Sequence, residues 1–142
     1  MRVVVDASTV VKWYIPEKNH VEAKRLRDDY LDGKHELVAP HLLGFEVVNA
    51  LRYSGHYEGE RLVEASESLS EYGLELRPFS DCGHVAEIAD ELDVSVYDAS
   101  YVSLASAAGS VVFTADEALV NEVSESEYAE HVEHIGDYET FG

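Results

Sequence analysis

Four carboxylates stand out because each lies in an apolar stretch of the chain: Asp6 in VVVDAS, Glu46 in LLGFEVVNAL, Asp98 in VSVYDASYV and Asp116 in VVFTADEAL. A buried carboxylate costs free energy unless its pKa rises or a cation neutralises it. If the four converge, their mutual repulsion requires a divalent ion, and carboxylate oxygens without Cys or His ligands suit Mg²⁺ or Mn²⁺. The sequence therefore predicts a metal site formed by these four acids.

Each acid also has a simpler interpretation. Asp6 and Asp98 can serve as helix N-caps, and Asp116 can be a favourable charge at the start of a short helix. Glu46 lies inside an apolar helix, where a salt bridge to Arg52 would explain its presence. These alternatives remain open at the level of the sequence.

The elements that must position the acids alternate between strands and helices. The predicted strands cover residues 3–5, 37–39, 74–79 and 111–114, with one further edge strand near 132–135. The predicted helices cover residues 8–15, 19–32, 41–53, 58–72, 82–92, 99–108 and 116–123. This order predicts a three-layer α/β/α fold with a central parallel sheet of four to five strands. In such sheets the site forms beyond the carboxyl ends of the strands, which is where Asp6 falls.

The length of 142 residues suits a single domain, 1–142, in which the tail after about residue 123 has no clear assignment. No apolar run approaches the roughly 18 residues that a membrane span needs. The lone cysteine, Cys82, cannot form an internal disulfide, which fits a reducing compartment. We therefore expect a cytoplasmic protein with no membrane partner.

The formal net charge is −19, from 29 acidic and 10 basic side chains. Residues 78–142 contain 15 of the acids and no Lys or Arg. An acidic shell of this kind is typical of proteins from a salt-rich cytoplasm, where screening removes the self-repulsion. We therefore expect a halophilic protein whose polyanionic partners approach the N-terminal half.

Four motifs, taken together and in order, resemble a PIN domain, and more narrowly the toxin ribonucleases of VapBC toxin–antitoxin pairs. They are DAS at residues 6–8 with KW at 12–13, FEVVNAL at 45–51, YDASYVSLA at 97–105 and TAD at 114–116. The resemblance covers the chain from Val3 to about Val120.

The resemblance implies an Mg²⁺- or Mn²⁺-dependent endoribonuclease that hydrolyses RNA phosphodiesters with metal-activated water. Asp6 and Asp98 would be direct metal ligands, and Glu46 and Asp116 would bind directly or through water. The hydroxyls of Ser8 and Thr114 would orient water at the metal. The resemblance further implies a homodimer that is silenced by a small antitoxin.

An RNA-facing surface is expected among the basic residues from Lys12 to Lys34, with Lys12 and Trp13 as candidate RNA-binding residues. Two other functions keep the same fold: an RNA-processing nuclease that is not a toxin, and a non-catalytic RNA- or protein-binding module. Phosphotransfer classes fit poorly. A dehalogenase-like phosphatase needs a second aspartate where Ser8 stands, and a receiver domain needs a late lysine, whereas none follows Lys34.

Overall fold

The computed structural model describes residues 1–140 and contains a central sheet of five parallel strands. The strands are β1 (Arg2–Val5), β2 (Glu36–Pro40), β3 (Glu75–Arg77), β4 (Val112–Thr114) and β5 (Val132–His134), in the spatial order β3-β2-β1-β4-β5. The predicted parallel α/β sheet is thus confirmed. The expected edge strand near residues 132–135 is also confirmed, because β5 pairs with β4 and places His134 opposite Thr114.

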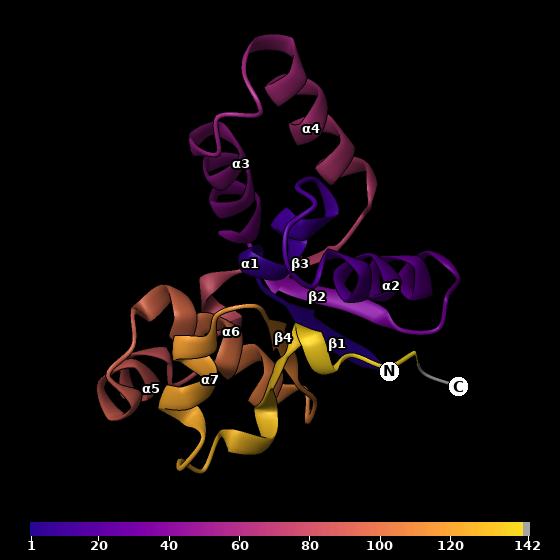
Figure 1. The fold of residues 1–142 in the computed structure, drawn as a ribbon. Helices are drawn as coiled ribbons and strands as arrows, with labels where there is room; N and C mark the ends of the chain where they lie inside the picture. The colour runs from indigo at the N-terminus through magenta and orange to yellow at the C-terminus, as the bar shows by residue number, and fades with distance from the viewer. Residues whose placement is uncertain (141–142) are drawn as a thin grey trace.

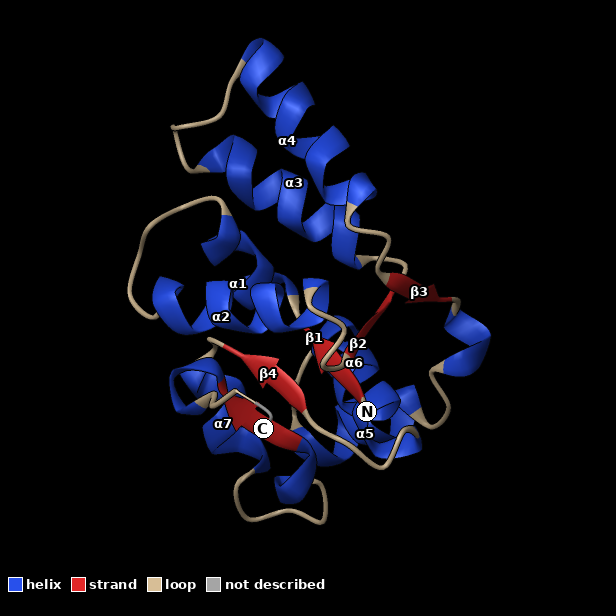
Figure 2. Cartoon of the chain, turned by 90° about the vertical axis from the view of Figure 1, so that its right-hand side faces the viewer, coloured by secondary structure: helices blue, strands red, loops and turns tan. Residues whose placement is uncertain are grey.

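In the described part of the chain, seven α-helices connect and cover the strands (Figure 1). They are α1 (Ala7–Val10), α2 (His20–Leu31), α3 (Leu43–Tyr53), α4 (Gly59–Glu71), α5 (Val85–Leu92), α6 (Val96–Ala107) and α7 (Glu117–Val123). Helix α6 packs against β1, β2 and β4, with α5 beside it, and α1 and α2 lie over the opposite face of the sheet (Figure 2). The result is the predicted three-layer α/β/α arrangement. None of the helices within residues 1–140 is long and apolar enough to cross a membrane.

The core forms around β1, the middle strand, whose Val3, Val4 and Val5 are completely buried. Runs of valine suit a parallel strand that is covered on both faces, because every side chain then meets another layer. From β1 the chain goes first to β2 on one side and later to β4 on the other. The carboxyl ends of β1 and β4 therefore flank the point where the strand order reverses, which is the usual position of a site in such sheets.

Helices α3 and α4 form a hairpin that projects away from the sheet (Figures 1 and 2). The hydroxyl of Tyr57, in the loop between them, donates a hydrogen bond of 2.8 Å to the Tyr14 carbonyl. The Tyr14 hydroxyl in turn lies 3.1 Å from the Ser68 hydroxyl on α4. These contacts fix the hairpin to the segment that follows α1.

Two expected helices differ from the structure near the site. The helix expected to follow Ser8 is split into α1 and a 3₁₀ turn (Val11–Trp13), and its N-cap is Asp6. The helix expected to open at Asp98 begins at Val96 and is capped by Ser95, whose hydroxyl accepts from the Asp98 amide. Asp98 therefore lies in the first turn, and the N-cap interpretation of this residue is wrong.

Candidate active site

Asp6 is held at the end of β1 by hydrogen bonds to both oxygens of its carboxylate. Oδ1 accepts from the Ser8 hydroxyl at 2.7 Å and from the Thr9 amide at 3.1 Å, and Oδ2 accepts from the Thr114 hydroxyl at 2.5 Å. The bond from Thr9 makes Asp6 the N-cap of α1, as the simpler interpretation allowed. The bond from Thr114 goes further, because it joins the ends of the adjacent strands β1 and β4.

The turn after β4 places Asp116 beside this arrangement. The Ala115 amide donates to the Ser8 hydroxyl at 2.9 Å, and the Asp116 amide donates to the Thr114 hydroxyl at 3.0 Å. Asp116 Oδ1 accepts from the Ala118 amide at 3.0 Å and the Leu119 amide at 3.3 Å, so this residue caps α7. Ser8 and Thr114 direct their hydroxyl hydrogens to Asp6, and their expected role in orienting water stays a prediction.

Glu46 and Asp98 reach the site from helices. Glu46 lies in the first turn of α3, and its Oε1 accepts a hydrogen bond of 2.6 Å from the Tyr101 hydroxyl on α6. The alternative salt bridge from Glu46 to Arg52 is absent from residues 1–140. Asp98 lies in the first turn of α6, three positions before Tyr101. All four acids thus lie at helix N-termini, where the helix dipole favours negative charge.

The raised pKa values of Asp6, Glu46 and Asp98 show that the charges of the site act on one another. Burial raises the pKa of Asp6 from 3.8 to about 6, against the lowering effect of its hydrogen bonds, and the charge of Asp98 raises it further. Burial also raises the pKa of Glu46, as does the charge of Asp98. The pKa of Asp98 is raised by burial and by the charge of Asp116. Within residues 1–140, none of the four acids forms a salt bridge to Lys, Arg or His.

The donor set fits a hard divalent cation, because it consists of carboxylates whose charges repel and that form no salt bridge to a basic side chain among residues 1–140. Over the described part of the chain, however, no three His, Cys, Asp or Glu side chains are arranged as a ready metal-binding group. The acids are therefore close enough to influence each other's pKa without converging on one point. Small side-chain movements would have to complete a coordination sphere.

Lys12 and Trp13 do not form the exposed RNA-facing surface that we expected. Lys12 is buried and pairs with Glu17 at 3.1 Å. Trp13 is buried, donates its indole N–H to the Ala23 carbonyl at 2.9 Å and packs edge-to-face on Tyr72. Their sequence position among basic residues is misleading, because both side chains are buried and Trp13 lies against α2.

Tyr101 is the site residue that the sequence alone did not reveal. Its side chain is almost fully buried, and burial together with the neighbouring Glu46 carboxylate raises its pKa, so the phenol stays protonated and can donate. A signal was present in YDASYVSLA, because residues three apart on a helix share a face and Tyr101 follows Asp98 by three. The partner, Glu46, is 55 positions away and could not be inferred.

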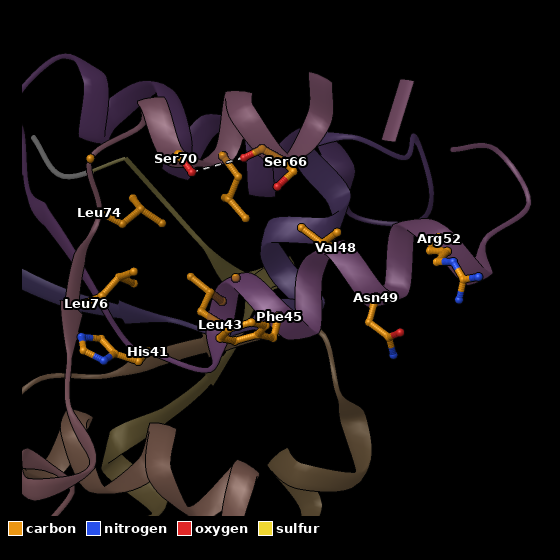
Figure 3. Close-up of a pocket in the computed structure, with 13 residues that line it drawn as sticks. His41, Leu43, Phe45, Val48, Asn49, Arg52, Ser66, Ser70, Leu74 and Leu76 are labelled. Atoms are coloured by element: carbon orange, nitrogen blue, oxygen red, sulfur yellow. Dashed lines mark hydrogen bonds between the residues drawn. The ribbon is translucent and has the colours of Figure 1, made fainter. Parts of the chain in front are cut away.

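A separate groove of about 620 Å³ lies between α3, α4 and the segment leading into β3 (Figure 3). Its walls are mainly apolar, with Leu43, Val48 and Leu74 among the side chains that line it. Phe45, at this groove, is 82% exposed. No carboxylate lines the groove, so it is distinct from the acid site although Glu46 adjoins Phe45 in α3.

Comparison with known proteins agrees with this architecture. A solved structure of a Pyrobaculum aerophilum protein superposes with a TM-score of 0.64, covering 95% of this chain and 90% of that one at 22% identity, which is a likeness of fold. Ribonuclease VapC3 of the same organism is 32% identical over 125 residues, which are 84% of this chain and 92% of that protein. The sequence model of the PIN domain matches residues 3–125, a range that includes all four acids. The chain belongs to the PIN domain family.

Proposed function

We propose that this protein is a metal-dependent endoribonuclease whose site consists of Asp6, Glu46, Asp98 and Asp116. The observation that carries the proposal is the electrostatic coupling of these acids at the carboxyl edge of the sheet, without a protein cation beside them in residues 1–140. The similarity to a ribonuclease supports RNA as the substrate.

The residues of the chain have separable roles in this proposal. Asp6 and Asp98 would hold the metal ion directly, and Glu46 and Asp116 would hold it directly or through water. Ser8 and Thr114 orient the Asp6 carboxylate through the hydrogen bonds described above. When bound, Mg²⁺ or Mn²⁺ would activate water and stabilise the charge that develops on the phosphate and the leaving oxygen.

The toxin role is part of the same proposal and rests on the similarity to a VapC protein. A toxin of this kind would act in the cytoplasm as a homodimer and would be held inactive by a cognate antitoxin. An RNA-processing nuclease outside a toxin–antitoxin pair is the alternative function with the same chemistry. A non-catalytic PIN-like module is less well supported, because all four acids are present.

The acidic shell suggests a setting for this activity. We propose that the net charge of −19 is an adaptation to molar salt. Phosphate attraction to Lys and Arg is weak at high salt, so an RNA substrate would depend more on metal bridging and on base stacking than on basic residues.

The decisive experiment is an RNA cleavage assay with Mg²⁺ or Mn²⁺ and with a chelator. Asp6→Asn should lower metal-dependent cleavage by more than about a hundredfold, because it removes a direct ligand charge while keeping the shape of the side chain. Asp32→Asn, the same change at an exposed acid after α2, is the matched control. Equal cleavage by the wild type and Asp6→Asn would refute the assignment.

The same variant separates the toxin from the other nuclease. Expression of the wild-type chain in a host cell without the antitoxin should arrest growth, and Asp6→Asn should relieve the arrest. Metal-dependent cleavage in vitro combined with harmless expression would favour the RNA-processing alternative.

A further inference from the structure

Tyr101 links two elements that supply acids to the site. Its side chain is 2% exposed, so the position of its hydroxyl is set by the packing of α6 against the sheet. A buried tyrosine hydroxyl needs a hydrogen-bond partner, and here the partner is the Glu46 carboxylate at 2.6 Å. A core that required only an aromatic ring at this position would be served equally well by phenylalanine.

Glu46 depends on this contact more than Asp6 and Asp116 depend on any one of theirs. Asp6 accepts three hydrogen bonds and Asp116 accepts two. Within residues 1–140, the hydrogen bond from Tyr101 is the single one to the Glu46 carboxylate. Glu46 is half-buried and belongs to the projecting α3–α4 hairpin, so without Tyr101 its flexible side chain could turn toward water.

Tyr101 itself belongs to α6, which packs on the strands that lead into the other acids. Tyr101 and Asp98 are three positions apart on α6, and α6 packs on β1, which leads into Asp6, and on β4, which leads into Asp116. A hydroxyl on α6 therefore aligns Glu46 with the remaining carboxylates. Groups of this kind, which orient a ligand without contacting the metal, commonly change metal affinity by about 10- to 100-fold when they are removed.

We propose that Tyr101 is a positioning residue that holds Glu46 in place for the divalent ion of the nuclease site. This inference rests on the function proposed above and adds a residue to it. Tyr101 does not contact the substrate or the metal; it acts through the Glu46 carboxylate.

The test is a calorimetric titration of the full chain with MnCl₂ alone, without RNA. Tyr101→Phe should weaken Mn²⁺ binding about tenfold or more, because the ring remains and only the hydroxyl is lost. Tyr57→Phe is the matched control, since it removes another buried tyrosine hydroxyl that fixes the α3–α4 hairpin but donates to a backbone carbonyl. It should bind Mn²⁺ within about twofold of the wild type.

A double-mutant cycle shows whether Tyr101 acts through Glu46. Tyr101→Phe should have no further effect on Mn²⁺ affinity in a Glu46→Ala background, because the group that it positions is already gone. A weakening of the same size in both backgrounds would overturn the inference, as would unchanged or tighter binding by Tyr101→Phe alone. In the cleavage assay, excess Mn²⁺ should restore most of the rate of Tyr101→Phe.

Two further variants, Glu46→Asp and Asp6→Asn, distinguish the possible outcomes of the titration. If Tyr101→Phe does not fold, Glu46→Asp retracts the carboxylate from the hydroxyl while keeping its charge, and an unchanged Mn²⁺ affinity would then overturn the inference. Asp6→Asn separates this inference from the proposed function. Loss of binding in Asp6→Asn with normal binding in Tyr101→Phe refutes only the role of Tyr101, whereas no Mn²⁺ binding by the wild type refutes the metal site itself.

Discussion

The two sides of the acid site are constructed differently. On the strand side, formed by Asp6, Thr114 and Asp116, the carboxylates accept hydrogen bonds from backbone amides and hydroxyls within two short strand-to-helix turns. On the helix side, formed by Glu46 and Asp98, one buried hydroxyl from α6 orients Glu46. Asp6 and Asp116 are positioned by their own turns, with Thr114 of the neighbouring strand adding a bond to Asp6, whereas Glu46 on the projecting α3 is positioned by a side chain from another helix.

The carboxylates on the two sides also differ in burial, and therefore in the free energy that it costs to keep them charged. Asp6 is 6% exposed, and despite three hydrogen bonds its pKa is raised to about 6. Glu46 and Asp98 are half-buried, so water can relieve part of their repulsion. Asp6, on the strand side, is therefore held tightly at a high electrostatic cost, whereas Glu46 and Asp98 on the helix side are held less tightly. A metal ion would offset the larger cost at Asp6.

The largest effect that tests this comparison is the pH dependence of stability in the absence of metal. The pKa of Asp6 rises from 3.8 to about 6 on folding, so the folded chain binds a proton more tightly than the unfolded chain. The free energy of unfolding should therefore fall as the pH rises from about 4 to above 6, and the shift of roughly 2 units corresponds to about 3 kcal/mol. Asp6→Asn should remove this contribution and make the metal-free protein more stable at pH 7.5.

Urea unfolding in EDTA at pH 4 and pH 7.5 measures this effect. Other acids also titrate in this range, so the informative quantity is the difference between the wild type and Asp6→Asn, with Asp32→Asn as the control for loss of a surface charge. An Asp6→Asn variant that is less stable at pH 7.5 would show that the capping hydrogen bonds outweigh the cost of burying the charge.

The next largest effect concerns the strand side and is the loss of stability when the Thr114 hydroxyl is removed. Thr114→Val keeps the shape of a fully buried side chain but removes the donor to Asp6 and the acceptor for the Asp116 amide. We expect a loss of about 2 kcal/mol in the free energy of unfolding at pH 7.5, because a hydrogen bond to a buried charge is lost. Chemical denaturation is the measurement, and Thr114→Ser, which retains the hydroxyl and loses only a methyl group, should lose about 1 kcal/mol.

Tyr101→Phe provides the corresponding measurement on the helix side. It should cost less stability than Thr114→Val, because half-buried Glu46 can turn to water when its donor is lost. An equal or larger loss for Tyr101→Phe would mean that the two sides are equally rigid, and the contrast between them would be wrong.

The same contrast explains what the sequence could predict. Asp6 comes one residue after β1 and Asp116 two residues after β4, and the edge at which parallel strands end was enough to bring them together. Glu46 and Asp98 were identified by their apolar neighbours, but the hydrogen-bond partner of Glu46, Tyr101, comes from tertiary packing. The local sequence pattern also failed to predict that Trp13 is buried, because the 3₁₀ turn that contains it has no strong periodicity.

The smallest expected effect concerns the salt dependence of the whole chain. Asp98 and Asp116 lie in the part of the sequence that has no Lys or Arg, and their mutual repulsion raises the pKa of Asp98. Raising KCl from 0.1 to 2 M shortens the screening length from about 10 Å to below 3 Å, so this repulsion and that of the acidic shell should weaken.

We expect the free energy of unfolding to increase by about 1 kcal/mol, seen as a rise of roughly 2–4 °C in the thermal midpoint in EDTA. If Mn²⁺ binds as proposed, it would neutralise the site, so the rise in its presence should come from the shell alone and be smaller. A midpoint that stays constant across this range would reject the halophilic interpretation, and an equal rise with and without Mn²⁺ would show that salt acts on the shell and not on the site.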